Sequence, residues 1–230
     1  MSLSAQFSAL YRLYYKRTER EAFLRGGPPP VQGLSDAELQ QLRALEPARL
    51  RRVVDLHAGD IGGQWYQPRV PGTWLALQAA LEIPQAELVH RLTESPGFEN
   101  RHNDDSDARA LAAFVRLHQR ELAVTPWIED LLAYERLLGC PWDDGPNPRV
   151  VEFAFDVGAI LESLLEHNLC PVYEPRRHTC LLLFRGPQGT NEIALRRHDA
   201  EAAKALLAGA PSRGNAAFRR AEQLLRDIRS

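Results

Sequence analysis

The chain has 230 residues, of which 44% are hydrophobic and 25% are charged, and its formal net charge is -2 at pH 7. These values are ordinary for a globular protein, and this length suits one large domain or two small ones. Nucleic-acid-binding proteins need a concentrated basic surface that displaces counterions, so this charge argues against nucleic acid as a partner. The three cysteines are widely spaced and odd in number, which argues against a disulfide framework.

The amino-terminal residues lack the apolar core of a signal peptide, because charged residues such as Arg12 and Lys16 follow closely. No apolar run approaches the ~20 residues that a membrane-spanning helix needs. We therefore expect a cytoplasmic protein in a reducing environment, with no membrane partner.

The first part of the chain shows helical patterning. Apolar residues recur at three- and four-residue steps from Leu3 to Tyr14, which predicts an opening helix that ends at the Gly/Pro run 26–30. Ser35 and Glu38 have the spacing of a capping box and predict the start of the next helix. A further helix is predicted over 48–58, with Gly59, Gly62 and Gly63 ending it, and 64–72 is predicted as a loop.

The remaining elements follow in two groups. The first group consists of helices, which are predicted over 74–81, 85–92 and 107–122 and after Pro126. The second group mixes strands and helices. It has a strand over 149–156, a helix over 157–165, a possible short strand over 170–173, a hairpin of strands 179–185 and 192–196, and helices over 199–207 and 215–228. Asp199 is the expected N-cap of the first closing helix. The fold class is therefore α+β and mostly helical: a helical domain over 1–140, a linker over 141–148, and a small α+β module with a short antiparallel sheet over 149–230.

The sequence contains no nucleophile motif. Cys180 lies in an apolar run where a thiol is usually buried, and Cys140 and Cys170 each precede a proline with no flanking charge to lower the thiol pKa. Trp127 and His118 are expected in the core. We therefore predict no catalytic residue.

Two groups of residues have the chemistry of metal ligands. His57 with Asp60, and His102 with Asp104, Asp105 and Asp107, combine imidazole and carboxylate groups that suit iron or zinc. A metal-dependent enzyme is therefore an alternative. We favour a polar loop that caps the following helix, because aspartates near a helix start suit its macrodipole, and we predict no metal site.

The predicted hairpin offers a binding surface, because a sheet of few strands leaves edges with unpaired amides and carbonyls. Such an edge can accept an extended peptide as an additional strand, unless the closing helices cover it. The residues predicted to bind a peptide are Thr179, Leu181, Leu183, Arg185, Ile193 and Leu195.

A DNA-binding regulator is the third possibility, because a strand pair beside helices can resemble a winged helix. The last helix has basic character, with Arg213, Arg219, Arg220, Arg226 and Arg229. Such a set is more often a solvated face.

Five segments resemble the MbnC-type partner proteins of multinuclear iron enzymes of the DUF692 type, which modify ribosomally made peptides. They are 7–14, 22–24, 126–136, 151–161 and 180–185. The resemblance implies a heterodimer with the iron enzyme, a bound precursor leader, and conversion of core cysteines to oxazolone and thioamide groups, as in methanobactin biosynthesis. Sister partner families fit the same segments.

The resemblance also implies that iron belongs to the partner subunit and that this chain holds no cofactor. Aromatic residues on loops can anchor an interface, although Trp65 and Tyr66 fit a core equally well. The predicted partner interface consists of Trp65, Tyr66, Arg101, His102 and Asp104.

Overall fold

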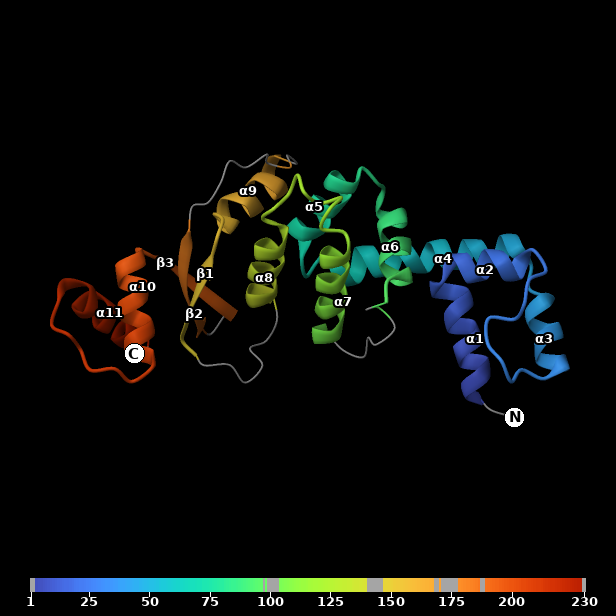
Figure 1. Ribbon diagram of the computed structural model, residues 1–230, viewed down its shortest axis with the longest axis horizontal. Helices are drawn as coiled ribbons and strands as arrows, with labels where there is room; N and C mark the ends of the chain where they lie inside the picture. The colour runs from blue at the N-terminus through green and yellow to red at the C-terminus, as the bar shows by residue number, and fades with distance from the viewer. Residues whose placement is uncertain are drawn as a thin grey trace. The chain divides into compact units, whose positions relative to one another are not determined.

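The computed structural model describes residues 3–96, 98, 104–139, 147–167, 170, 178–186 and 189–228. This part is mostly helical and contains one antiparallel sheet of three strands (Figure 1). The predicted α+β, mostly helical class is therefore confirmed.

The chain divides into two compact units. The first comprises Met1–Pro68 and Leu77–Gln119, and the second comprises Arg69–Ala76 and Arg120–Ser230. The division differs from the predicted boundary at residue 140, because the helix after Pro126 packs with the sheet. Residues 141–146 of the predicted linker lie outside the described residues.

The first unit is built from helices. They are α1 (Leu3–Tyr15), α2 (Arg17–Leu24), α3 (Asp36–Arg43), α4 (Pro47–Asp60), a π-helix (Ile61–Tyr66), the end of α5 (Pro71–Leu81), α6 (Gln85–Glu94) and α7 (Asp104–Leu117). The single opening helix expected from the sequence is in fact two helices. Lys16 separates them with an extended backbone (φ -109°, ψ 93°), and its buried ammonium donates to the carbonyl of Thr93 at 3.0 Å.

The capping box at the start of α3 is confirmed. The Glu38 amide donates to the Ser35 hydroxyl, and the Glu38 carboxylate accepts from the Ser35 amide. These bonds from the Ser35 backbone and hydroxyl lower the pKa of Glu38. The predicted helix end at Gly59 is wrong, since α4 continues directly into the π-helix. Gly62 lies against Gln85 of α6, because a Cβ there would come within 2.5 Å of the Nε2 atom of Gln85.

A buried arginine of α2 bonds to the end of α1. Arg20 is 3% exposed, and its Nη1 atom donates to the carbonyls of Leu13 and Tyr14 at 3.1 and 3.2 Å. Burial lowers the pKa of this guanidinium. Because these carbonyls belong to the end of α1, Arg20 ties α2 to α1 across the break at Lys16.

The second unit contains the sheet and the helices around it. Its elements are α8 (Ile128–Gly139), β1 (Arg149–Phe153), α9 (Val157–His167), β2 (Thr179–Gly186), β3 (Gly189–Leu195), α10 (Arg197–Leu207), α11 (Ala216–Asp227) and the start of α5. The predicted hairpin is confirmed as β2–β3, and β2 lies between β1 and β3. Residues 171–173 of the possible short strand lie outside the described residues.

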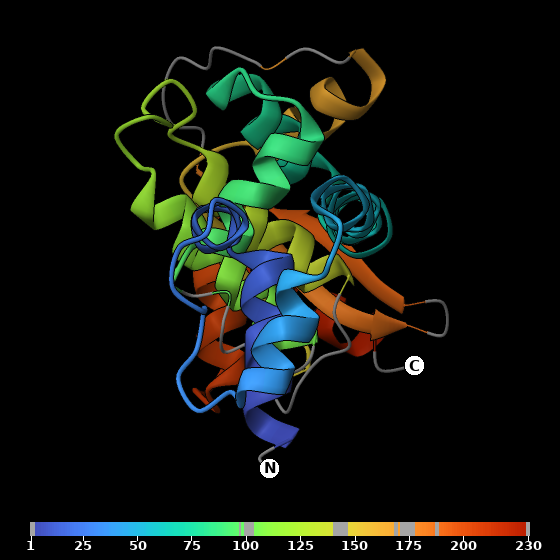
Figure 2. The same ribbon diagram turned by 90° about the vertical axis from the view of Figure 1, so that its right-hand side faces the viewer.

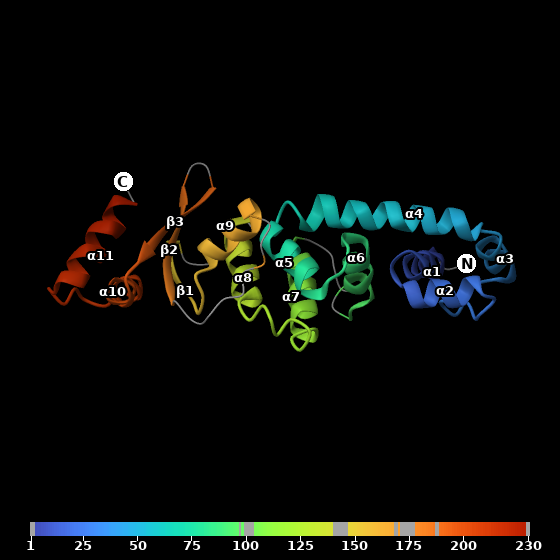
Figure 3. The same ribbon diagram turned by 90° about the horizontal axis from the view of Figure 1, so that it is seen from above.

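Helices cover both faces of the sheet (Figures 1 and 3). On one face, Val150 and Leu195 pack against the cluster that α10 and α11 form through Ala202, Ala203, Phe218 and Ala221. On the other face, Phe153 meets the ring of Tyr134 in α8 edge-on at 5.9 Å. Because both faces are buried, β2 reads as a continuous apolar run.

Of the two helices that follow the sheet, α11 begins as predicted and α10 does not. Asn215 caps α11 by accepting from the amide of Phe218 at 2.9 Å. The expected N-cap Asp199 is wrong, because α10 begins at Arg197 and Arg196 takes the N-cap position. Asp199 instead accepts from the guanidinium of Arg220 at 2.6 Å, which holds α10 against α11.

A buried carboxylate holds the start of α5 against α8. Glu135 is 3% exposed and accepts from the amides of Gly72 and Thr73 at 2.7 and 2.8 Å. Burial raises the pKa of Glu135, while the two amide bonds oppose that shift. Gly72 is closely packed, because a Cβ there would lie 2.4 Å from the Cδ1 atom of Leu161 and would have to displace that side chain.

We expect Glu135→Ala to lower the free energy of unfolding by about 2–4 kcal/mol, because it leaves two buried amide donors without an acceptor. Glu135→Gln keeps an acceptor and is expected to cost less. Urea denaturation measures both, and Glu166→Ala on the exposed side of α9 is the control. Because the pKa of Glu135 is raised in the folded state, the wild-type advantage over Glu135→Gln should shrink as pH rises through that pKa. An Ala variant as stable as the control would contradict this role.

Candidate functional site

The topology does not leave the predicted β2 residues at a sheet edge. Leu181 pairs with Val151 on one side and Ala194 on the other, and Leu183 is likewise paired on both sides. Both leucines are buried. Thr179 pairs with β1, and the Arg185 amide donates to the Oδ1 atom of Asn147 at 3.0 Å. The backbone of β2 is thus used within the sheet, because the apolar run takes the central position.

The sheet has two edge strands, β1 and β3, and the register of β3 shows which of its residues face outward. The pair Gly186–Gly189 closes a two-residue connection, and such a pair exchanges both of its backbone hydrogen bonds. Bonded and non-bonded pairs alternate along an antiparallel ladder, so Ile193 and Leu195 direct their backbone groups toward β2. The amide and carbonyl of Glu192 and Ala194 consequently point away from the sheet.

The outward residues are accessible. Glu192 and Ala194 are exposed, whereas Ile193 and Leu195 are half-buried. Within the described part of the chain, β2 is the single strand neighbour of β3. The apolar side chains of Ile193 and Leu195 predict peptide contact from the sequence, whereas Glu192 and Ala194 carry no such signal, because edge donors are identified by register and not by hydropathy.

The two faces beside this edge differ in chemistry. On one face, Ile193 and Leu195 present apolar side chains next to α10. On the other, the buried hydroxyl of Tyr134 bonds to the Glu192 carboxylate, and burial followed by Glu192 raises the pKa of Tyr134 above its ordinary range. A strand added beside β3 would thus meet aliphatic groups on one face and an acidic, α8-lined surface on the other.

Among the predicted partner-interface residues, Tyr66 is the one whose side chain belongs to the described part of the structure. Tyr66 is 3% exposed at the end of the π-helix and belongs to the core of the first unit. Trp65 lies in the same π-helix and Asp104 begins α7, but their side chains lie outside the described residues. Arg101 and His102 also lie outside them.

The candidate metal ligands either bond to other side chains or lie outside the described residues. The Nε2 atom of His57 lies 2.5 Å from the Tyr15 hydroxyl, and Asp60 accepts from Gln64. His102 and the side chains of Asp104 and Asp105 fall outside the described residues. Among the side chains that are described, no three His, Cys, Asp or Glu residues are grouped to hold a metal ion.

The described cysteines are poor nucleophiles. Cys180 is 4% exposed, and burial together with the neighbouring Glu152 carboxylate raises the pKa of its thiol. Burial also raises the pKa of Cys170. Since the thiolate is the reactive form, both environments oppose nucleophilic chemistry.

Three of the five arginines predicted at the last helix have partners within the chain, whereas Arg219 is exposed and Arg229 lies outside the described residues. Arg220 bonds to Asp199, Arg226 lies 3.6 Å from Glu222, and Arg213 lies over the ring of Phe218. These contacts reduce the basic surface that a DNA-binding regulator would need. Trp127, by contrast, is fully buried as expected, and His118 packs against the ring of Phe114.

No protein-family model and no curated protein matches this chain. No helix among the described residues is long and apolar enough to cross a membrane. The candidate site is the edge of β3, because its register and exposure leave the backbone groups of Glu192 and Ala194 accessible.

We expect Tyr134→Phe to lower the free energy of unfolding by about 1 kcal/mol, because it removes the hydroxyl that links α8 to Glu192. An absorbance titration should also lose a tyrosine whose pKa is raised above the ordinary value. Tyr14→Phe is the matched control, since its hydroxyl makes no hydrogen bond within the described residues. Equal stability of the two variants would contradict this linkage.

Proposed function

We propose that this chain is the non-catalytic partner subunit of a DUF692-type iron enzyme and binds the leader of a ribosomally made precursor peptide. The proposal joins the resemblance of five segments to MbnC-type partner proteins with the geometry of the sheet. The partner would oxidise core cysteines to oxazolone and thioamide groups, as in making a methanobactin-type copper chelator, in the cytoplasm.

One observation carries the binding role: the backbone groups of Glu192 and Ala194 point away from β2 on an exposed edge strand. An extended peptide can pair with such groups as a fourth strand, and its affinity then comes largely from main-chain hydrogen bonds. Specificity comes from alternate side chains, because successive residues of a strand face opposite sides of the sheet.

The two faces beside β3 indicate which leader sequence fits. Residues on one face would extend the apolar surface of Ile193 and Leu195. Residues on the other face would approach Glu192, whose negative charge favours a basic or hydrogen-bond-donating side chain. The leader segment should thus alternate aliphatic residues with polar or basic ones.

Holding the leader also explains how a chain without catalytic residues can contribute to the reaction. A tethered core peptide reaches a high effective concentration at the partner's active site, with no further contact required. The chemistry, including iron and dioxygen, would belong to the partner subunit.

We expect Ala194→Pro to weaken binding of the leader at least about tenfold, because proline removes an outward amide donor and leaves the ladder to β2 intact. Fluorescence anisotropy measures this with a labelled synthetic peptide that alternates aliphatic and basic residues, as the proposed leader does. Ala194→Val is the matched control, since it keeps the amide and suits a strand.

Thermal unfolding of both variants separates loss of the outward donor from loss of the sheet. Equal leader affinity of the folded Pro and Val variants would show that this edge does not pair with the peptide. No binding of the leader by the wild-type chain would remove the leader-binding role altogether.

The separately purified chain is expected to contain no stoichiometric iron, while its complex with the iron enzyme should contain several iron ions per heterodimer. Inductively coupled plasma mass spectrometry measures both. Two or more iron ions per isolated chain would remove the partner-subunit proposal in favour of a metal-dependent enzyme.

A further inference from the structure

One side of α4 is built into the first unit. Leu50, Val54 and Ala58 recur at four-residue steps and are buried at 6%, 3% and 4% exposure. In Figure 2, α4 and α2 are both viewed nearly end-on, and no other helix of this unit lies on the side of α4 turned away from α2. Figure 3 agrees, because α4 runs along the border of the unit. The opposite side of α4 is therefore an outer surface.

Two aliphatic residues occupy that outer side. Leu56 is 64% exposed and Val53 is 39% exposed, and they lie three residues apart on adjacent turns. A single exposed leucine is common on protein surfaces and carries no meaning by itself. Here the pair is flanked by Arg49 and Arg52, so a small apolar centre has a basic border.

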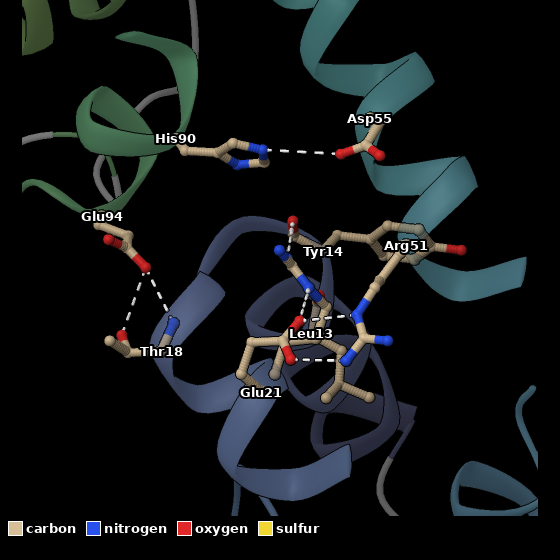
Figure 4. Close-up of polar contacts among 9 residues, drawn as sticks. Leu13, Tyr14, Thr18, Glu21, Arg51, Asp55, His90 and Glu94 are labelled. Carbon is tan, nitrogen blue, oxygen red and sulfur yellow. Dashed lines mark hydrogen bonds and ion pairs between the residues drawn. The ribbon is translucent and has the colours of Figure 1, made fainter. Parts of the chain in front are cut away.

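The other charged residues of α4 are used inside the unit (Figure 4). The Arg51 guanidinium bonds to the Glu21 carboxylate of α2 at 2.7 Å, and Asp55 lies 3.7 Å from the ring of His90 in α6. At the carboxyl end of α4, Asp60 accepts from Gln64.

Arg49 and Arg52 differ from these residues, since neither has a carboxylate partner within the described part of the chain. The outer side of α4 therefore keeps two positive charges that the fold does not use.

We propose that this outer surface of α4, made of Arg49, Arg52, Val53 and Leu56, docks an acidic amphipathic helix of a partner protein. The four residues span two helical turns, about 10 Å, which matches a stripe of the same length on an opposing helix. Aliphatic residues of the partner would cover Leu56 and Val53, and its carboxylates would meet the two arginines.

Charge disfavours a parallel pairing of α4 with a second copy of the chain, because it would set Arg49 and Arg52 of one copy beside the same arginines of the other. Analytical ultracentrifugation of the wild-type chain tests an antiparallel pairing. The proposal does not depend on the proposed function, because it uses a different unit and a different surface.

The test uses the full chain, labelled with ¹⁵N, and two synthetic helical peptides that share a leucine stripe. One peptide carries glutamates beside the stripe and the other carries lysines. At peptide concentrations of about 1 mM, chosen for weak binding, we expect the acidic peptide to shift amide resonances of residues 49–60. The lysine peptide should leave them in place.

Substitutions on α4 test the contacts. Leu56→Glu and Arg52→Glu are each expected to weaken binding of the acidic peptide at least about tenfold, because they remove the apolar centre and reverse one border charge. Leu165→Glu on α9 and Arg219→Glu on α11 are matched controls, since each makes the same exchange on an exposed helix position elsewhere. They should leave the affinity unchanged.

Three results would overturn the proposal: equal shifts by both peptides, shifts that map away from α4, or equal affinity of the α4 variants and their controls. Analytical ultracentrifugation supplies a fourth. If the wild-type chain forms a dimer that Leu56→Glu dissociates, a second copy occupies this surface and the acidic-helix proposal is wrong. Circular dichroism of each variant establishes that the helices are intact.

Discussion

The second unit depends on burying one strand on both of its faces. Leu182 and Leu183 have no exposed surface, although they point to opposite sides of β2. An apolar strand of this kind needs a helical layer on each side, because either face left in water would lose the free energy gained by burial. The α10–α11 pair covers one face, and α8 covers the other. The same demand makes β2 the central strand and leaves β3 at the edge.

This arrangement determines what the sheet can bind. A central strand offers no free backbone, so recognition of an extended chain is limited to an outer strand such as β3, where alternate residues direct amides and carbonyls outward. The Tyr134–Glu192 bond fixes α8 beside that strand, and Leu195 connects its other face to α10. The edge of β3 is thus accessible, and side-chain contacts hold it to α8 and to the α10–α11 cluster.

The interior of the first unit contains charged side chains, whereas β2 in the second unit is buried among apolar ones. Arg20 remains charged while buried by donating to carbonyls at the end of α1, and Lys16 donates to Thr93. Such groups are tolerated when they are hydrogen-bonded, and they specify how short helices meet. Arg51 and Asp55 are exposed but also contact neighbouring helices, through Glu21 of α2 and His90 of α6. On the outer side of α4, Arg49 and Arg52 make no such contact within the described part of the chain, and this is the surface that we propose docks another molecule.

The sequence by itself determined the local signals: the mostly helical α+β class, the capping box at Ser35, the hairpin, and Trp127 as a core residue. Each follows from chemistry within a few residues or from hydropathy period. Tertiary structure decided the rest. The break at Lys16 depends on a contact with the distant Thr93, and the outward groups of Glu192 and Ala194 depend on which neighbours β2 acquires. Long-range packing and register leave no local pattern, because they arise only when distant segments of the chain meet.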